Sequence, residues 1–246
     1  MNLKVGFEIE GGVNLTDGAD LYDFELDLAD AGMVLTRDAH HYEGYDVPDM
    51  EAITRGEGSE FYRSELETFI DVMNKYEYIS EPQRTGLHIN VSPADGFFSD
   101  KMASKIITTY IMLEETLYNI LPSGRRTNRY SGYDCDSHIN RMKEKIESLS
   151  IHQLDAGQIL KVIKEARNDY SIKYCGLGLH HMFYEDDSKK RLEFRLFDSR
   201  LNNLEFNLKI VENLIQFCEN HTIYQVLKKC EKVRNYKISI HSLLHL

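Results

Sequence analysis

The chain has 246 residues, a length consistent with one large domain or two small ones. Hydrophobic residues make up 42% and charged residues 28%, which is ordinary for a globular protein and excludes a disordered or collagen-like chain. The net charge of −11 is concentrated in residues 1–60, which carry 15 acidic and 3 basic side chains. Because Lys and Arg are not clustered there, we expect no binding to nucleic-acid backbones or membrane surfaces.

The cellular setting is suggested by two further features. The N-terminal segment reaches charged residues at once, and no segment approaches the ~20 apolar residues of a membrane helix. The four cysteines contain no C-x-x-C pair and lie far apart, at Cys135, Cys175, Cys218 and Cys230. We therefore expect a reduced, cytoplasmic protein, of an oligomeric state that the sequence does not indicate.

The order of predicted elements indicates an α+β fold. Alternating polar and apolar residues predict strands at 3–10, 33–36, 47–54, 86–92, about 171–184 and about 191–198. Helical spacing and capping residues predict helices at 21–31, 59–76, 99–121, 137–148, 153–168, 203–219 and 221–234, with a loop at 122–136. Without regular βαβ spacing, we expect a mainly antiparallel sheet with helices on one face. We expect residues 1–246 to form a single domain with a helical extension from about residue 221.

Glu8 and Glu10 are the first candidate site residues. Their i, i+2 spacing on a strand places both carboxylates on one face, where they raise each other's pKa unless a cation lies between them. Magnesium suits such a pair because it prefers a few protein oxygens, with water and phosphate completing its shell. The alternative is a solvent-facing polar edge of an amphipathic strand.

Two more strands carry candidates. Glu51 lies in the alternating segment Met50-Glu51-Ala52-Ile53, where surface solvation is the alternative. His88 and Asn90 share the polar face of the strand G-L-H-I-N-V-S, where the histidine is either a ligand or a hydrogen-bonded structural residue.

The segment R-L-E-F-R-L-F-D places Arg191, Glu193 and Arg195 on one face. Either they form an ion-pair ladder, or Glu193 binds a metal while Arg195 meets an anionic group. The predicted loop contains three more arginines, which either bind phosphate oxygens or are simply exposed to solvent: Arg125, Arg126 and Arg129. The adjacent pair His180-His181 is expected on a strand, where neighbouring side chains point apart and chelate poorly.

The order of these motifs resembles that of the amidoligase family. The matching blocks are G-F-E-I-E, M-E-A-I-T, G-L-H-I-N-V-S and R-L-E-F-R-L-F-D-S, and the resemblance extends from residue 3 to about residue 219. That family belongs to the carboxylate–amine ligases, whose catalytic domain is similar to glutamine synthetase and glutamate–cysteine ligase. The resemblance implies a curved, mainly antiparallel sheet whose concave face carries magnesium ions and ATP.

The resemblance also implies roles for individual residues. It assigns metal binding, by two or more Mg²⁺ or by Mn²⁺, to Glu8, Glu10, Glu51, His88 and Glu193. From the resemblance together with the residue patterns above, we expect direct catalytic roles for Glu51, His88 and Arg195, and contacts with ATP from Asn90, Arg125, Arg126, Arg129 and Arg195. Asn90 replaces the second histidine of the family's G-x-H-x-H strand, and an amide cannot transfer a proton there.

The expected activity is ATP-dependent amide formation between a small or peptide-like carboxylate and an amine, through an acyl phosphate. Two alternatives remain open. One is a metal-dependent amide or peptide hydrolase that uses the acidic face to activate water. The other is a non-catalytic nucleotide-binding module of the same fold.

Overall fold

The computed structural model describes most of the chain, in the residues 1–15, 18–37, 46–56, 58–81, 85–121, 142, 144–146, 148, 155–166 and 176–246. The predicted loop with Arg125, Arg126 and Arg129 lies outside the described residues, as does most of the predicted helix at 137–148.

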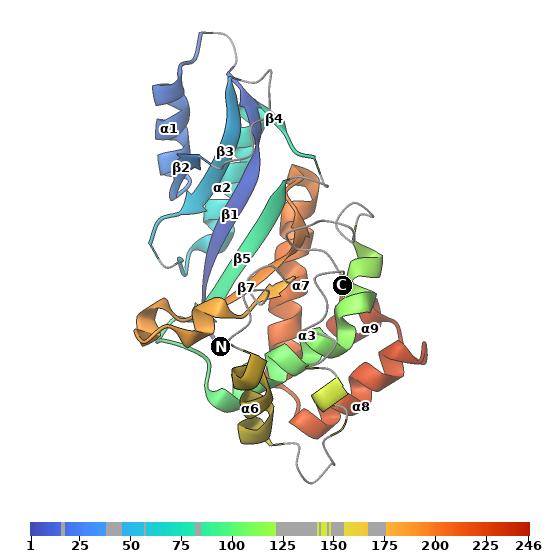
Figure 1. The fold of residues 1–246 in the computed structure, drawn as a ribbon. Coiled ribbons are helices and arrows are strands. Elements are labelled where there is room, and N and C mark those ends of the chain that lie inside the picture. The colour runs from blue at the N-terminus through green and yellow to red at the C-terminus, as the bar shows by residue number, and fades with distance from the viewer. Residues whose placement is uncertain are drawn as a thin grey trace.

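Within the described residues, strands form one open, uncurled sheet in the order β2-β3-β1-β5-β7-β6, and β4 also pairs with β1 (Figure 1). All pairings are antiparallel. The strands are β1 (Leu3–Asn14), β2 (Met33–Arg37), β3 (Val47–Thr54), β4 (Glu77–Ile79), β5 (Gly86–Pro93), β6 (Leu177–Gly178) and β7 (Leu192–Asp198).

The described helices gather on the apolar face of this sheet and beyond its lower end (Figure 1). They are α1 (Leu21–Asp30), α2 (Tyr62–Lys75), α3 (Asp100–Ile120), α6 (Ala156–Ala166), α7 (Leu201–Glu219), α8 (Ile223–Arg234) and α9 (Ile240–Leu244), with 3₁₀ turns η3 (His180–Phe183) and η4 (Asp187–Lys189). Helices α2 and α7 contact the strands directly, while α3 packs against α6, α7 and α8. Tyr110 of α3 meets Phe194 of β7 edge to face, so the apolar side chains of the strands point toward the helices.

The prediction of an α+β fold with an antiparallel sheet is confirmed, although the sheet is uncurled where a curved one was expected. Ser99 caps α3 as predicted, accepting a hydrogen bond from the Met102 N–H. Helix α2 begins at Tyr62, three residues after the predicted start. The reason is that Ser59 instead pairs with Val5 of β1 through two backbone hydrogen bonds of 2.9 and 3.0 Å.

Other differences lie where the local pattern is short. Of the predicted strand at 171–184, the described residues contain only the two-residue β6, followed by the 3₁₀ turn η3. The short elements β4 and α9 were not predicted. None of the helices formed by described residues combines the length and the apolarity needed to span a bilayer.

The end of α7 is held by a buried lysine from α3. Lys105 is only 7% exposed, and its Nζ donates hydrogen bonds to the carbonyl oxygens of Cys218 and His221. The last carbonyls of a helix have no partner within the helix, so a charged donor from a neighbouring helix satisfies them. Lys105 therefore fixes α3 against α7, which in turn lies against β5 and β7.

We expect Lys105→Met, which keeps the side-chain length, to lower the free energy of unfolding by about 1–3 kcal/mol because it strands these carbonyls without a donor. Urea unfolding followed by circular dichroism measures the effect. Lys101→Met, at an exposed position one turn earlier in α3, is the matched control and should change stability little. Equal stability of the two variants would contradict this role for Lys105.

Candidate functional site

A strip of polar side chains crosses the sheet face opposite the helices. Strand pairing sets Glu8 opposite His88, Asn90 opposite Glu193 and Glu10 opposite Glu51. Alternation along each strand then brings the predicted residues onto one surface, as far as they are described: Glu8, Glu10, Glu51, His88, Asn90, Glu193 and Arg195.

Glu8 is the best-connected carboxylate of the strip. Its Oε2 lies 2.8 Å from Nδ1 of His88, and its Oε1 accepts a 2.9 Å hydrogen bond from Nδ2 of Asn90. Burial would raise the pKa of Glu8, but the hydrogen bonds and charge of His88 and Asn90, together with the charge of Arg195, lower it to about 2. Glu8 is therefore ionised at neutral pH.

His88 lies between the two carboxylates of β1. Its Nε2 is 3.7 Å from Oε1 of Glu10, and its Nδ1 also lies 3.5 Å from Oε1 of Glu193. Burial and the charge of Arg195 would lower the pKa of His88, but the hydrogen bond with Glu8 and the charges of Glu10 and Glu193 raise it. The spacing of Glu8 and Glu10 predicted a cation between them, and the imidazole of His88 lies in that position.

Glu10 is held where β1 changes partners from β5 to β4. Its Oε2 accepts a 2.6 Å hydrogen bond from the Gly86 N–H, and its carbonyl oxygen accepts one of 2.7 Å from the Ser199 hydroxyl. The Tyr78 hydroxyl lies 3.0 Å from the same carbonyl. A Cβ at Gly11 would stand 2.4 Å from the Tyr78 ring, so glycine there lets the tyrosine approach.

Glu193 is buried at 1% exposure, and each of its two oxygens has different surroundings. Oε1 accepts a 2.8 Å hydrogen bond from Nη1 of Arg195. Oε2 has no hydrogen-bond partner among the described residues. Among the described residues, a direct hydrogen bond therefore reaches only one of the two oxygens.

The remaining members of the motifs differ in role. Asn90 uses both ends of its amide, because its Oδ1 accepts a 3.0 Å hydrogen bond from Nε of Arg191. Of the ion-pair ladder that was one of the two alternatives for this strand, the structure contains the pair between Arg195 and Glu193, and Arg191 donates to Asn90. Asp198, at the end of β7, accepts hydrogen bonds from Arg200 and Asn203 at the start of α7. We assign it a structural role.

Glu51 lies at one end of the strip. It neighbours Glu10 across the strand pair, and its Oε2 accepts a 2.7 Å hydrogen bond from the Thr36 hydroxyl of β2. It is not part of either cluster of potential metal ligands found among the described residues.

The prediction that His180 and His181 point apart was wrong. They occupy the 3₁₀ turn η3 rather than a strand, and their ring centroids lie 3.7 Å apart. Burial lowers the pKa of His181 to about 3, and the charges of Arg191 and His180 act in the same direction. Neither histidine was predicted near Glu193, because a tight turn directly after a two-residue strand leaves no periodic signal in the sequence.

In the part of the chain that the structure describes, two sets of ligand atoms lie close enough to hold an ion, with the atoms of each set within 4.8 Å of one another. One contains Glu8, His88 and Glu193, and the other contains His180, His181 and Glu193. The first set, with Glu10 beside it, offers the carboxylate oxygens that Mg²⁺ or Mn²⁺ prefers. Its three residues were predicted on three separate strands, and the structure brings their ligand atoms close together.

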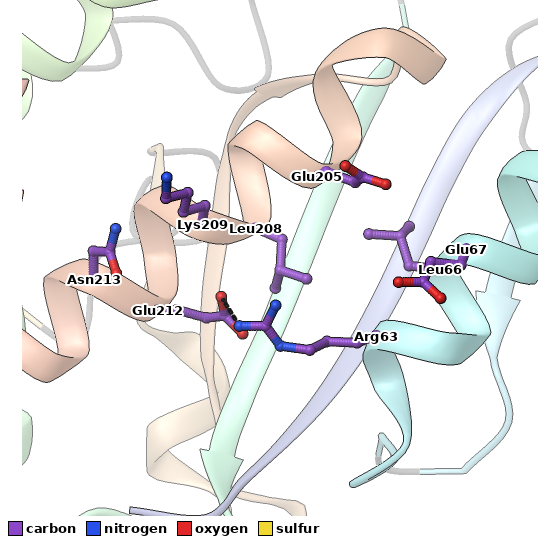
Figure 2. A pocket seen from close by; sticks show the side chains of 8 residues that line it. All are labelled: Arg63, Leu66, Glu67, Glu205, Leu208, Lys209, Glu212 and Asn213. Atoms are coloured by element: carbon purple, nitrogen blue, oxygen red, sulfur yellow. Dashed lines mark hydrogen bonds and ion pairs between the residues drawn. The ribbon is translucent and has the colours of Figure 1, made fainter. Parts of the chain in front are cut away.

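A separate groove lies on the helical side of the sheet, between α2 and α7 (Figure 2). Its lining includes Arg63 and Glu212, which form a 2.7 Å ion pair across it. None of the polar-strip residues lines this groove, so it is not part of the candidate site.

Comparison with known proteins supplies one match. Residues 60–219, which are 160 of the 246 residues, match a family model described as "putative amidoligase enzyme". The matched range includes His88, Asn90, Glu193 and Arg195 and begins after Glu8, Glu10 and Glu51. No curated protein matches the chain.

The space around Glu193 yields a prediction about Gly178, its partner in β6. A Cβ at Gly178 would lie 2.6 Å from Oε2 of Glu193, so the carboxylate or the strand must move. We expect Gly178→Ala to lower the free energy of unfolding by about 1–3 kcal/mol in urea with EDTA present.

Gly157→Ala is the matched control, because Gly157 lies in α6, where a helical Ala is favoured over Gly by about 0.5–1 kcal/mol. The control should be as stable as the unchanged protein or more so. If Gly178→Ala is equally well tolerated, Glu193 is not confined as described.

Proposed function

The chain belongs to the amidoligase family, and from that premise we propose that it is an ATP- and magnesium-dependent ligase that joins a carboxylate to an amine. The observation that carries the proposal is the meeting of Glu8, His88 and Glu193 on the open face of the sheet, with Arg195 bonded to Glu193. The substrates are a small or peptide-like carboxylic acid and an amine.

The donor set fits magnesium. Glu8 and Glu193 contribute carboxylate oxygens, Glu10 lies next to them, and His88 adds a nitrogen that Mn²⁺ also accepts. Bound Mg²⁺ would neutralise charge on the ATP phosphates as the γ-phosphoryl group is transferred. The distances support the fit, because Oε2 of Glu8 and Oε1 of Glu193 lie 2.8 and 3.5 Å from Nδ1 of His88.

The proposed reaction has two steps. First, a substrate carboxylate oxygen attacks the γ-phosphorus of ATP, the bond to ADP breaks, and an acyl phosphate forms. Second, the amine nitrogen attacks the acyl carbon, the bond to phosphate breaks, and the nitrogen loses a proton. Both steps concentrate negative charge, so a site with cationic groups lowers the barrier.

The chain's own residues have distinct tasks in this proposal. Arg195, whose Nη1 bonds Glu193, binds phosphate or substrate carboxylate through its guanidinium. Arg125, Arg126 and Arg129 contact the nucleotide, a hypothesis that concerns residues outside the described part of the chain. Asn90 holds Glu8 in place and cannot transfer a proton, so the proton of the amine must leave through another group, for which Glu51 is the candidate.

We also propose that the sheet corresponds to the catalytic sheet of the glutamine synthetase-like ligases. In support, the acids come from the first strand and from β7, with the histidine strand β5 between them. This is the arrangement that the resemblance implies for the metal-binding face.

The decisive measurement is binding of an ATP analogue in Mg²⁺ and in EDTA, followed by ADP release with panels of acids and amines. We expect binding only with Mg²⁺, and ADP release only when both an acid and an amine are present. If the protein does not bind the ATP analogue in Mg²⁺, the ligase proposal is wrong. Binding without turnover favours the non-catalytic module, and amide cleavage without ATP favours the hydrolase.

A second prediction concerns the magnesium ligands. Glu8→Gln should weaken Mg²⁺-dependent nucleotide binding at least about tenfold, because it removes a charged ligand and keeps the side-chain shape. Calorimetry with a non-hydrolysable ATP analogue measures the change. Glu25→Gln, at an exposed position on α1, is the matched control and should bind like the unchanged protein. Full binding by Glu8→Gln would remove Glu8 from the metal site.

A further inference from the structure

The second cluster of potential ligands lies beside the first, on the far side of Glu193. Gly178 of β6 pairs with Glu193 of β7, and the chain then turns through η3, which brings His180 and His181 over the carboxylate. Nδ1 of His180 and Nε2 of His181 each lie 3.7 Å from Oε2 of Glu193. Two imidazoles and one carboxylate oxygen thus converge on one point.

The carboxylate oxygen at this point is available to a cation. Oε2 of Glu193 has no hydrogen-bond partner among the described residues, and the side chain is 1% exposed. A buried polar oxygen without a hydrogen-bond donor loses its hydration without direct replacement. The hydrogen bond from Nη1 of Arg195 goes to the other oxygen, Oε1.

The backbone leaves room at the same oxygen. A Cβ at position 178 would stand 2.6 Å from Oε2, so a glycine is what keeps this side of the carboxylate open. His181 is held here too, since its ring packs edge to face against Tyr184 at a centroid distance of 5.2 Å. The cluster is therefore assembled before any ligand arrives.

The donor chemistry differs from that of the first cluster. Two imidazoles and one carboxylate are typical ligands of Zn²⁺ and similar transition ions, whereas Mg²⁺ prefers oxygen alone. Ligand atoms in a tetrahedral site with bonds of about 2.0–2.1 Å are roughly 3.3–3.4 Å apart. The distances of 3.7 Å from Oε2 to the two nitrogens need only a small contraction to reach that geometry.

We propose that His180, His181 and Oε2 of Glu193 bind one divalent cation of the zinc class, at a site separate from the oxygen-rich cluster around Glu8. Three protein ligands leave a coordination position open to water or to a donor atom of a substrate. Glu193 joins the two sites through its two oxygens. The zinc-class site does not depend on the proposed ligase activity.

Metal titration without nucleotide tests this proposal on the full chain after EDTA treatment. Co²⁺ alone is followed by its visible absorption and Zn²⁺ alone by calorimetry. We expect one equivalent of either ion to bind, with Co²⁺ bands of the intensity of a four- or five-coordinate ion. Failure of the unchanged protein to bind either ion stoichiometrically overturns the proposal.

Variants then locate the ion. Replacing a residue that only hydrogen-bonds a metal ligand lowers metal affinity about 10–100-fold. Replacing a ligand itself, in His180→Ala or His181→Ala, should lower the affinity at least as much. His241→Ala, at an exposed position on α9, is the matched control and should bind unchanged. If His181→Ala does not fold, the partly exposed His180 decides the outcome. Full affinity in His180→Ala overturns the proposal.

Glu8→Gln separates this site from the magnesium site. It should keep Co²⁺ and Zn²⁺ affinity within about threefold while it loses Mg²⁺-dependent nucleotide binding, because Glu8 is not a ligand of the zinc-class ion. If Glu8→Gln lowers Co²⁺ affinity as much as His180→Ala does, the ion lies in the oxygen-rich cluster and the proposal is wrong. If neither the unchanged protein nor any variant binds nucleotide, that result contradicts the ligase proposal and does not bear on the zinc-class site.

Discussion

The polar face of the sheet depends on the balance of charge around buried carboxylates. Glu193 is buried and Glu8 and Glu10 are partly buried beside it, and a buried charge is tolerated only when it is paired and hydrogen-bonded. His88 reaches all three carboxylates, and Arg195 bonds Glu193. Because these pairs join β1, β5 and β7, the charges that define the site also specify how the central strands align.

Strand alternation explains why much of this site could be predicted. The spacing of Glu8 and Glu10, of His88 and Asn90, and of Glu193 and Arg195 fixes which face each pair occupies, and the structure confirms those faces. The predicted α+β class follows from the same alternation together with helical spacing. Alternation does not specify which residues lie opposite one another, because register depends on contacts between distant strands.

What could not be predicted depends on local geometry without a period. His180 and His181 sit in a 3₁₀ turn entered from a two-residue strand, so no repeat in the sequence marks them. The hydrogen bond from Arg191 to Asn90 of the neighbouring strand depends on side-chain reach, which spacing along one strand does not specify. Ser59 pairs with β1 although the residues after it form a helix. The two hydrogen bonds satisfy the backbone N–H and C=O of Val5, which a helix beginning at Ser59 would leave without these partners.

Asn90 shows how one substitution within a family pattern can change the balance of a site. A histidine at this position would add a titratable group to a face that already holds His88, whereas the amide donates to Glu8 and accepts from Arg191 without any charge. The amide therefore donates to Glu8 without a charge of its own. Among the described residues of this face, His88 lies between the carboxylates of β1 and β7, and His180 and His181 of η3 lie on the other side of Glu193. The consequence is a face with Glu8, Glu10 and His88 on one side of Glu193 and two imidazoles on the other, and the two proposed cation preferences rest on this difference in donors.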